Sequence, residues 1–237
     1  MRLTICGAVF VAASAIPAMA WADGGGPNFG KSGQLAISWD QAIGTPYVVG
    51  GAAGATAAGG AGGAGVLLAP PGSWSMIDFQ YASLSNNGGS GTQFGLAPAA
   101  DYFIMDNISV GGQILFSLAS YSPPQGPGVS ATTFGIAPQV GYNLGLTDNI
   151  SFWPKLFFQY ANTGISNNVG SVSSAAIGIF APFLYHPVQH FFVGIGPNFS
   201  AQVISSFSPG GGGASVDLAK ATTFGITATF GGYFLGD

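Results

Sequence analysis

Two histidines are the side chains of this chain whose spacing is closest to that of a metal or catalytic site. His186 and His190 lie four residues apart, a spacing that on a helix would place both imidazoles on one face as metal ligands. Pro187 lies between them, and proline disfavours the helix that such a site needs. No Asp or Cys lies nearby in the sequence to complete a ligand set. We therefore expect no catalytic residue, no metal and no cofactor, and interpret both histidines as residues of a tight turn.

Three charged residues lie inside regular segments of the sequence, namely Asp78, Asp101 and Lys155. Their positions in the alternating pattern described below place all three on the inner face of a barrel. An unpaired buried charge is costly, so each of them needs a partner or water. Asp101 and Lys155 lie toward the same end of the barrel and are the expected partners. We interpret them as a structural ion pair, with an ion-selective constriction as the alternative.

The elements that would position these side chains are β-strands, because apolar and small or polar residues alternate from Ser73 to Phe234. Ile150, Phe152 and Leu156 show the pattern, since a strand directs successive side chains to opposite faces. The alternation predicts eight strands, at residues 73–84, 92–103, 108–120, 132–144, 150–161, 175–185, 191–203 and 221–234.

The connections between these strands alternate strictly between short and long. The short ones are 104–107, 145–149 and 186–190, and the long ones are 85–91, 121–131, 162–174 and 204–220. In an up-and-down barrel this order places every short turn at one rim and every long loop at the other, as in outer-membrane barrels. The phrase Phe94–Pro98 recurs at 134–138, which indicates one hairpin in each repeat.

The composition favours a membrane barrel over a soluble one. Charged residues make up only 5% of the 237 residues, against roughly 25% in ordinary soluble domains. The mean hydropathy is +0.44, yet after residue 20 no apolar run approaches the ~20 residues of a membrane helix. We therefore predict an all-β protein, a transmembrane antiparallel up-and-down β-barrel of about eight strands. The net charge of −4 also argues against nucleic acid as a partner.

The chain divides into three expected regions. Residues 1–20 have the charged start, apolar core and small-residue ending (Ala18 and Ala20) of a signal peptide, whose cleavage would also remove Cys6, the only cysteine. Residues 21–72 form a Gly/Ala-rich N-terminal extension, and residues 73–237 form the barrel. A ten-strand barrel is the alternative, if 34–43 and 47–50 add a hairpin.

The two faces of the predicted strands differ in chemistry. The outer face carries large apolar side chains, and tyrosines near the strand ends are expected to form aromatic girdles at the membrane interfaces. The inner face carries Gln, Asn, Thr and many Gly, which favours a loose or hydrated lumen. The girdle residues are Tyr81, Tyr102, Tyr142, Tyr160 and Tyr185.

Several phrases resemble those of a known family. Asp101-Tyr102-Phe103 followed by residues 106–112, together with Phe152-Trp153-Pro154 and residues 231–234, is similar to bacterial outer-membrane β-barrel proteins of the group of the outer-membrane protein A transmembrane domain. The resemblance covers residues 73–237. It implies an anchor, adhesin, small pore or surface antigen, and it supplies no catalytic or ligand residue. The chain departs from the group by ending on residues 235–237 after Phe234, so the insertion signal is expected to lie slightly inside the terminus.

The expected function follows from these observations. We predict an integral outer-membrane protein of a Gram-negative cell, exported by its signal peptide, with a structural or surface scaffold role and no catalysis. Its partners would be outer-membrane lipid, lipopolysaccharide and, through the C-terminal strand, the barrel-insertion machinery; a soluble partner is left open. One alternative is a narrow, porin-like pore for water or small solutes, and the other is a secreted lipocalin-like barrel that binds an apolar ligand.

Overall fold

The computed structural model describes residues 29–43, 77–83, 90–123 and 125–234, which form one fourteen-stranded antiparallel sheet. The described residues contain no helix with the length and apolar character needed to cross a membrane. The strands are β1 (Leu35–Ile43), β2 (Ile77–Ser83), β3 (Ser90–Leu96), β4 (Ala99–Met105), β5 (Ile108–Ser122), β6 (Val129–Tyr142), β7 (Leu144–Thr147), β8 (Ile150–Phe152), β9 (Lys155–Ile165), β10 (Gly170–Phe180), β11 (Phe183–Val188), β12 (Phe191–Pro209), β13 (Val216–Asp217) and β14 (Thr222–Phe234).

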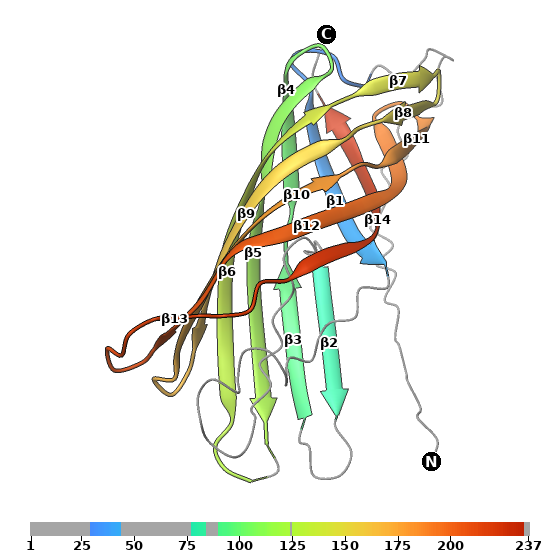
Figure 1. The fold of residues 1–237 in the computed structure, drawn as a ribbon. Helices are drawn as coiled ribbons and strands as arrows, with labels where there is room; N and C mark the ends of the chain where they lie inside the picture. Colours follow the sequence, from blue (N-terminus) through green and yellow to red (C-terminus); the bar gives the residue numbers. More distant parts are fainter. Residues whose placement is uncertain (1–28, 44–76, 84–89, 124, 235–237) are drawn as a thin grey trace.

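Eight of these strands close into a barrel. Around the ring the order is β1, β4, β5, β6, β9, β10, β12 and β14, and β14 pairs again with β1. Every pairing is antiparallel, and the strands are long and strongly tilted (Figure 1). The prediction of an all-β antiparallel barrel of about eight strands is confirmed.

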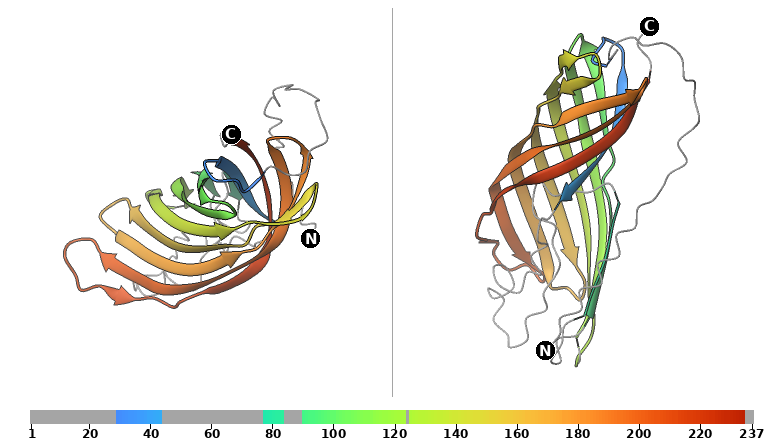
Figure 2. Two further views of the ribbon diagram at one scale, coloured as in Figure 1. Left: turned by 90° about the horizontal axis from the view of Figure 1, so that it is seen from above. Right: turned by 90° about the vertical axis from the view of Figure 1, so that its right-hand side faces the viewer.

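The strand that closes the ring is not the one expected. We expected the barrel to begin at residue 73, but β1, within the range assigned to the N-terminal extension, pairs with β14 from Leu35↔Phe234 to Ile43↔Ile226. It also pairs with β4 up to Ser38↔Ala99 (Figure 2, right). In contrast β2 pairs only with β3 in the described part of the chain, outside the ring. Residues 47–50, the other half of the alternative hairpin, lie outside the described residues.

Three of the predicted strands are each divided in two by a proline. Pro98 separates β3 from β4, Pro154 separates β8 from β9, and Pro182 separates β10 from β11. Proline lacks the N–H that a ladder needs, and at these three positions the strand is interrupted. Pro138 and Pro197, in contrast, lie within β6 and β12, which stay paired with β5 and β14 there. The chain nevertheless keeps its course, because β3 and β4 both pair with β5. The shorter pieces, β8 and β11, pair with each other, and β11 also pairs with the ring strand β12.

The short turns lie where they were predicted, at Asp106–Asn107, Asp148–Asn149 and Gln189–His190, and all three are at the upper rim in Figure 1. The prediction of a long loop at 162–174 is wrong. There β9 runs to Ile165 and β10 begins at Gly170, with a tight turn that has positive φ at Asn167 and Asn168. Small polar side chains pair across the strands in this region and extend the ladder. The Oγ1 atoms of Thr133 and Thr163, for example, are hydrogen-bonded at 2.8 Å.

The outside of the barrel is an apolar surface. Tyr102, Tyr142, Tyr160 and Tyr185, expected in the girdles, are all exposed, whereas the side chain of Tyr81 is outside the described part. The exposed large hydrophobic residues include Phe94, Ile114, Phe116, Leu118, Phe134, Ile136, Val140, Leu156, Phe158, Ile177, Ile195, Phe224, Ile226 and Phe234.

Inside, the glycines do not leave the loose lumen that we expected, because large neighbours cover them. A Cβ at Gly178 would lie 2.3 Å from the ring of Phe157, and a Cβ at Gly231 would lie 2.5 Å from the ring of Phe192. A ring on one strand thus lies over a glycine of the next. This agrees with the general rule that an eight-stranded barrel is just wide enough to be filled by side chains.

Candidate functional site

Two groups of buried side chains fill the short-turn half of the barrel. The first, here called the aromatic plug, consists of Phe29, Phe103, Trp153, Phe192 and Tyr233, with Ala36 and Leu184 at its edge. The second, here called the charge cluster, consists of Asp40, Asp101, Gln139 and Lys155. Lys155 joins the two groups, since its Nζ lies 4.5 Å from the centroid of the Trp153 ring.

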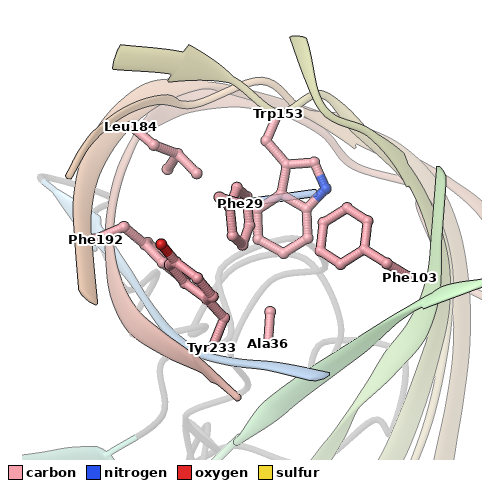
Figure 3. Close-up of a cluster of buried hydrophobic side chains, with 7 residues drawn as sticks. All are labelled: Phe29, Ala36, Phe103, Trp153, Leu184, Phe192 and Tyr233. Carbon is pink, nitrogen blue, oxygen red and sulfur yellow. The ribbon is translucent and has the colours of Figure 1, made fainter. Parts of the chain in front are cut away.

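Phe29 is the centre of the aromatic plug (Figure 3). Its ring centroid lies 5.1 Å from those of Phe103, Trp153 and Tyr233 and 5.3 Å from that of Phe192. The arrangements are edge-on or tilted, which the ring quadrupoles favour over face-to-face contact. Phe29 is 4% exposed, so this side chain closes the centre of the barrel at its short-turn end.

The backbone around Phe29 is held as firmly as its ring. Asn143 donates from Nδ2 to the Phe29 carbonyl at 3.0 Å, and Asn107 donates its N–H to the Gly30 carbonyl at 2.6 Å. Gly30 in turn donates its N–H to Oε1 of Gln34 at 2.8 Å. A side chain at Gly30 would be strained, because φ is +98° and its Cβ would lie 2.6 Å from Nδ2 of Asn143. The segment before β1 is therefore folded into the mouth of the barrel.

The two histidines have different partners and do not form a common site. The Nε2 atom of His186 lies 3.0 Å from Oγ of Ser151, and both residues are buried beside the plug. The Nδ1 atom of His190 lies 3.1 Å from the carbonyl oxygen of Tyr233. His186 itself belongs to β11, so the turn that we predicted from residue 186 begins later.

The Ser151–His186 pair lacks the other features of a hydrolytic centre. Ser151 is wholly buried, and Nδ1 of His186 has no hydrogen-bond partner among the described residues, so no carboxylate orients the ring. A serine nucleophile needs an oriented base and access for a substrate. Sequence reasoning missed this pair because 35 residues separate its members and only the pairing of β8 with β11 brings them together.

The charge cluster contains the ion pair that we expected and a third member that we did not. Lys155 Nζ lies 3.8 Å from Oδ2 of Asp101 and 3.6 Å from Oδ2 of Asp40. Asp101 and Lys155 are fully buried, and Asp40 is 13% exposed. Asp40 lies on β1, which we had placed outside the barrel. Asp78 lies on β2 opposite Gly95, and its side chain is outside the described part.

A glycine between two strands allows the amide of Gln139 to reach Asp101. In the sheet register Asp101 lies opposite Gly111, and Gly111 lies opposite Gln139. Gln139 donates from Nε2 to Oδ2 of Asp101 at 2.7 Å across this position. A Cβ at Gly111 would come within 2.5 Å of Oδ1 of Asp101 and 2.1 Å of the Ala100 carbonyl. The row of cross-strand neighbours Asp101, Gly111 and Gln139 therefore requires glycine at its centre.

A second glycine supports Lys155. Gly141 lies opposite Lys155 on one side and opposite Ser109 on the other. The indole of Trp153 occupies the space that a side chain at Gly141 would take, with Nε1 only 2.6 Å from an added Cβ. That Nε1 donates to Oγ of Ser109 at 3.2 Å. The indole is thereby fixed where its face meets the ammonium group, an arrangement that stabilises a cation.

A small cavity adjoins the charge cluster. Its volume is about 30 Å³, enough for a water-sized occupant or two. Asp40 and Gln139 belong both to its wall and to the charge cluster. The remaining lining residues are Gln113, Ala137, Phe157, Gln159, Phe180, Asn198 and Thr227.

Chemically, the site is a buried ion triad with a polar cavity. Within the described ranges, His, Cys, Asp and Glu do not gather in groups of three that would hold a metal ion. No protein-family model matches the sequence, and a search of curated proteins found no match.

Proposed function

We propose that this chain is an integral β-barrel protein of a Gram-negative outer membrane with a structural scaffold role and no catalysis. The observation that carries the proposal is the distribution of polarity around the ring. Large apolar side chains cover the outside, and the charges of the ring strands, Asp40, Asp101 and Lys155, are directed inward.

The exterior fits lipid better than water. Leu156, Phe134 and Phe224 are 59%, 57% and 75% exposed, and they lie on three different strands of the ring. Soluble monomers rarely expose contiguous apolar patches larger than a few hundred Å², whereas a barrel in lipid needs such a band all around. The same polarity argues against a secreted lipocalin-like barrel, which would present its polar face to solvent.

The packed interior supports a scaffold over a pore. The aromatic plug closes the short-turn end, and the charge cluster lies next to it. A water-conducting channel needs a continuous lumen, and larger barrels of 16–18 strands are the ones that leave such a channel. Outer-membrane lipid and lipopolysaccharide are the partners that such a scaffold implies. The resemblance to the outer-membrane protein A group is consistent with this role.

Nitroxide scanning tests the membrane assignment. On a Cys6→Ser background, single cysteines replace Leu156, Phe158 and Gln159, and the labelled proteins are folded into lipid vesicles. We expect the labels at 156 and 158 to be accessible to oxygen dissolved in lipid, and the label at 159 to be protected. Two outcomes would contradict the proposal and favour the soluble barrel. One is high accessibility of the labels at 156 and 158 to a water-soluble nickel complex, and the other is a stable monomer in buffer without detergent.

Planar-bilayer conductance separates the scaffold from the pore. The scaffold predicts no steady single-channel current from the folded protein. Steady channels that are abolished or altered by Lys155→Ala would contradict the scaffold and support the pore.

A further inference from the structure

The cavity beside the charge cluster, here called the polar chamber, is lined in part by Asp40, Gln113 and Gln139, whose side chains all carry oxygen atoms. Gln113 donates its amide Nε2 to the Ala97 carbonyl at 2.8 Å, and Gln139 donates its Nε2 to Asp101. Both amide nitrogens are thus engaged with the wall. These two hydrogen bonds use only Nε2, so the Oε1 atom of each amide is not engaged by them.

Asp40 adds a carboxylate oxygen to this set. Its Oδ2 faces Lys155 at 3.6 Å, whereas Oδ1 is buried and has no hydrogen-bond partner within the described ranges. Asp40 also lines the chamber. A buried carboxylate oxygen without a donor is costly, so Oδ1 calls for a positively charged or donating neighbour.

The charges around the chamber do not balance. Two carboxylates, Asp40 and Asp101, flank one ammonium group, Lys155, so the formal sum is −2 + 1 = −1. Other described charged side chains do not join this buried group in the ion pairs of the structure. In a low-dielectric interior an uncompensated charge is strongly unfavourable. One additional positive charge would neutralise the triad.

We propose that the polar chamber binds one monovalent alkali cation, Na⁺ or K⁺, through Oδ1 of Asp40 and the amide oxygens of Gln113 and Gln139. Hard cations select carboxylate and carbonyl oxygens, which is the donor set present here. A divalent ion would overcompensate the triad to +1. The chamber volume of about 30 Å³ admits a single ion with at most a water. The inference does not depend on the scaffold role.

Thermal unfolding of the detergent-folded protein tests this proposal. The midpoint is measured at one pH in NaCl, KCl and choline chloride at equal concentration, because choline is too large for the chamber. A ligand that binds only the folded state raises the midpoint with its concentration. We expect a higher midpoint in NaCl or KCl than in choline chloride, and we expect Asp40→Asn to abolish the difference.

Two further variants make the test decisive. Asp148→Asn removes an exposed carboxylate in a turn and should keep the full difference between the salts. Gln113→Leu should reduce the difference while leaving the Lys155 ion pairs intact, and it serves if Asp40→Asn does not fold. Equal midpoints in the three salts for the unmodified protein would overturn the proposal, as would a full difference that survives in both Asp40→Asn and Gln113→Leu.

Direct binding is followed with Tl⁺, a spectroscopic substitute for K⁺. A ²⁰⁵Tl resonance that broadens with the unmodified protein, recovers on adding KCl and does not broaden with Asp40→Asn supports the site. A midpoint that responds to pH but not to Na⁺ or K⁺, with no Tl⁺ signal, would show that a proton neutralises the triad instead and would overturn the cation site.

Discussion

Gln139 and Asp101 lie on strands that do not pair with each other, yet their side chains are joined by a hydrogen bond of 2.7 Å. The strand between them contributes Gly111 at the crossing point. Because Gly111 has no side chain, the hydrogen bond between Gln139 and Asp101 can span three strands of the barrel. This link orients the carboxylate that faces Lys155, so the inner ion triad depends on a residue that carries no charge and no polar side chain.

Gly111→Ala should therefore destabilise the barrel. The added Cβ meets backbone and carboxylate atoms that cannot both withdraw, and overpacking of this kind costs about 1–3 kcal/mol. The urea midpoint of unfolding, read from the gel mobility of unboiled samples, measures the effect. Gly145→Ala is the matched control, because a Cβ at Gly145 has nothing within 4 Å. An equal loss in both variants would refute the crossing role of Gly111.

Lys155→Met should destabilise the folded protein more than the removal of all three charges does. Loss of the ammonium group leaves Asp40 and Asp101 buried without their cationic partner, and breaking a buried pair costs about 3–5 kcal/mol. The triple variant Asp40→Asn, Asp101→Asn and Lys155→Met removes the unbalanced charges together. We expect it to recover most of the lost stability in the same urea titration, and a triple variant less stable than Lys155→Met would contradict this account.

Phe29→Ala should loosen the short-turn end of the barrel. The substitution removes the ring that contacts four other rings of the plug, and truncation of a buried Phe costs about 3–5 kcal/mol. Tryptophan fluorescence reports the change, since Trp153 lies 5.1 Å from Phe29. Phe224→Ala, at a side chain 75% exposed, is the control and should have a much smaller effect. Similar losses for the two variants would show that Phe29 is not the centre of a packed plug.

Leu156→Arg should impair folding into lipid vesicles more than Asn149→Arg. Both residues are exposed, but Leu156 belongs to the apolar outer surface on β9, whereas Asn149 lies in a short turn at the rim. An arginine on the lipid face costs about 2–4 kcal/mol at the bilayer midplane and about 0–1 kcal/mol near the interfaces. The folded fraction on an unboiled gel, measured across a urea series, gives both values. If the two variants fold equally well, the outer surface does not face hydrocarbon.

The local elements of the fold were accessible from the sequence because their signals are local. Alternation around Ile150, Phe152 and Leu156 assigns the faces of a strand from neighbouring residues alone. Turn residues such as Asp106 and Asn107 likewise mark their own positions, and Asn107 has the positive φ of +68° that asparagine tolerates. The pairing of Asp101 with Lys155 followed from the same parity, since both face inward at one end.

The tertiary structure decided which strands close the barrel and what fills it. Leu35 pairs with Phe234, and nothing within either segment specifies a partner almost 200 residues away. That closure brings Asp40 to Lys155 and places Phe29 in the mouth of the barrel, and neither contact leaves a periodic signal in the sequence. Alternation encodes which way a side chain points, whereas register and ring closure determine which inward side chains meet.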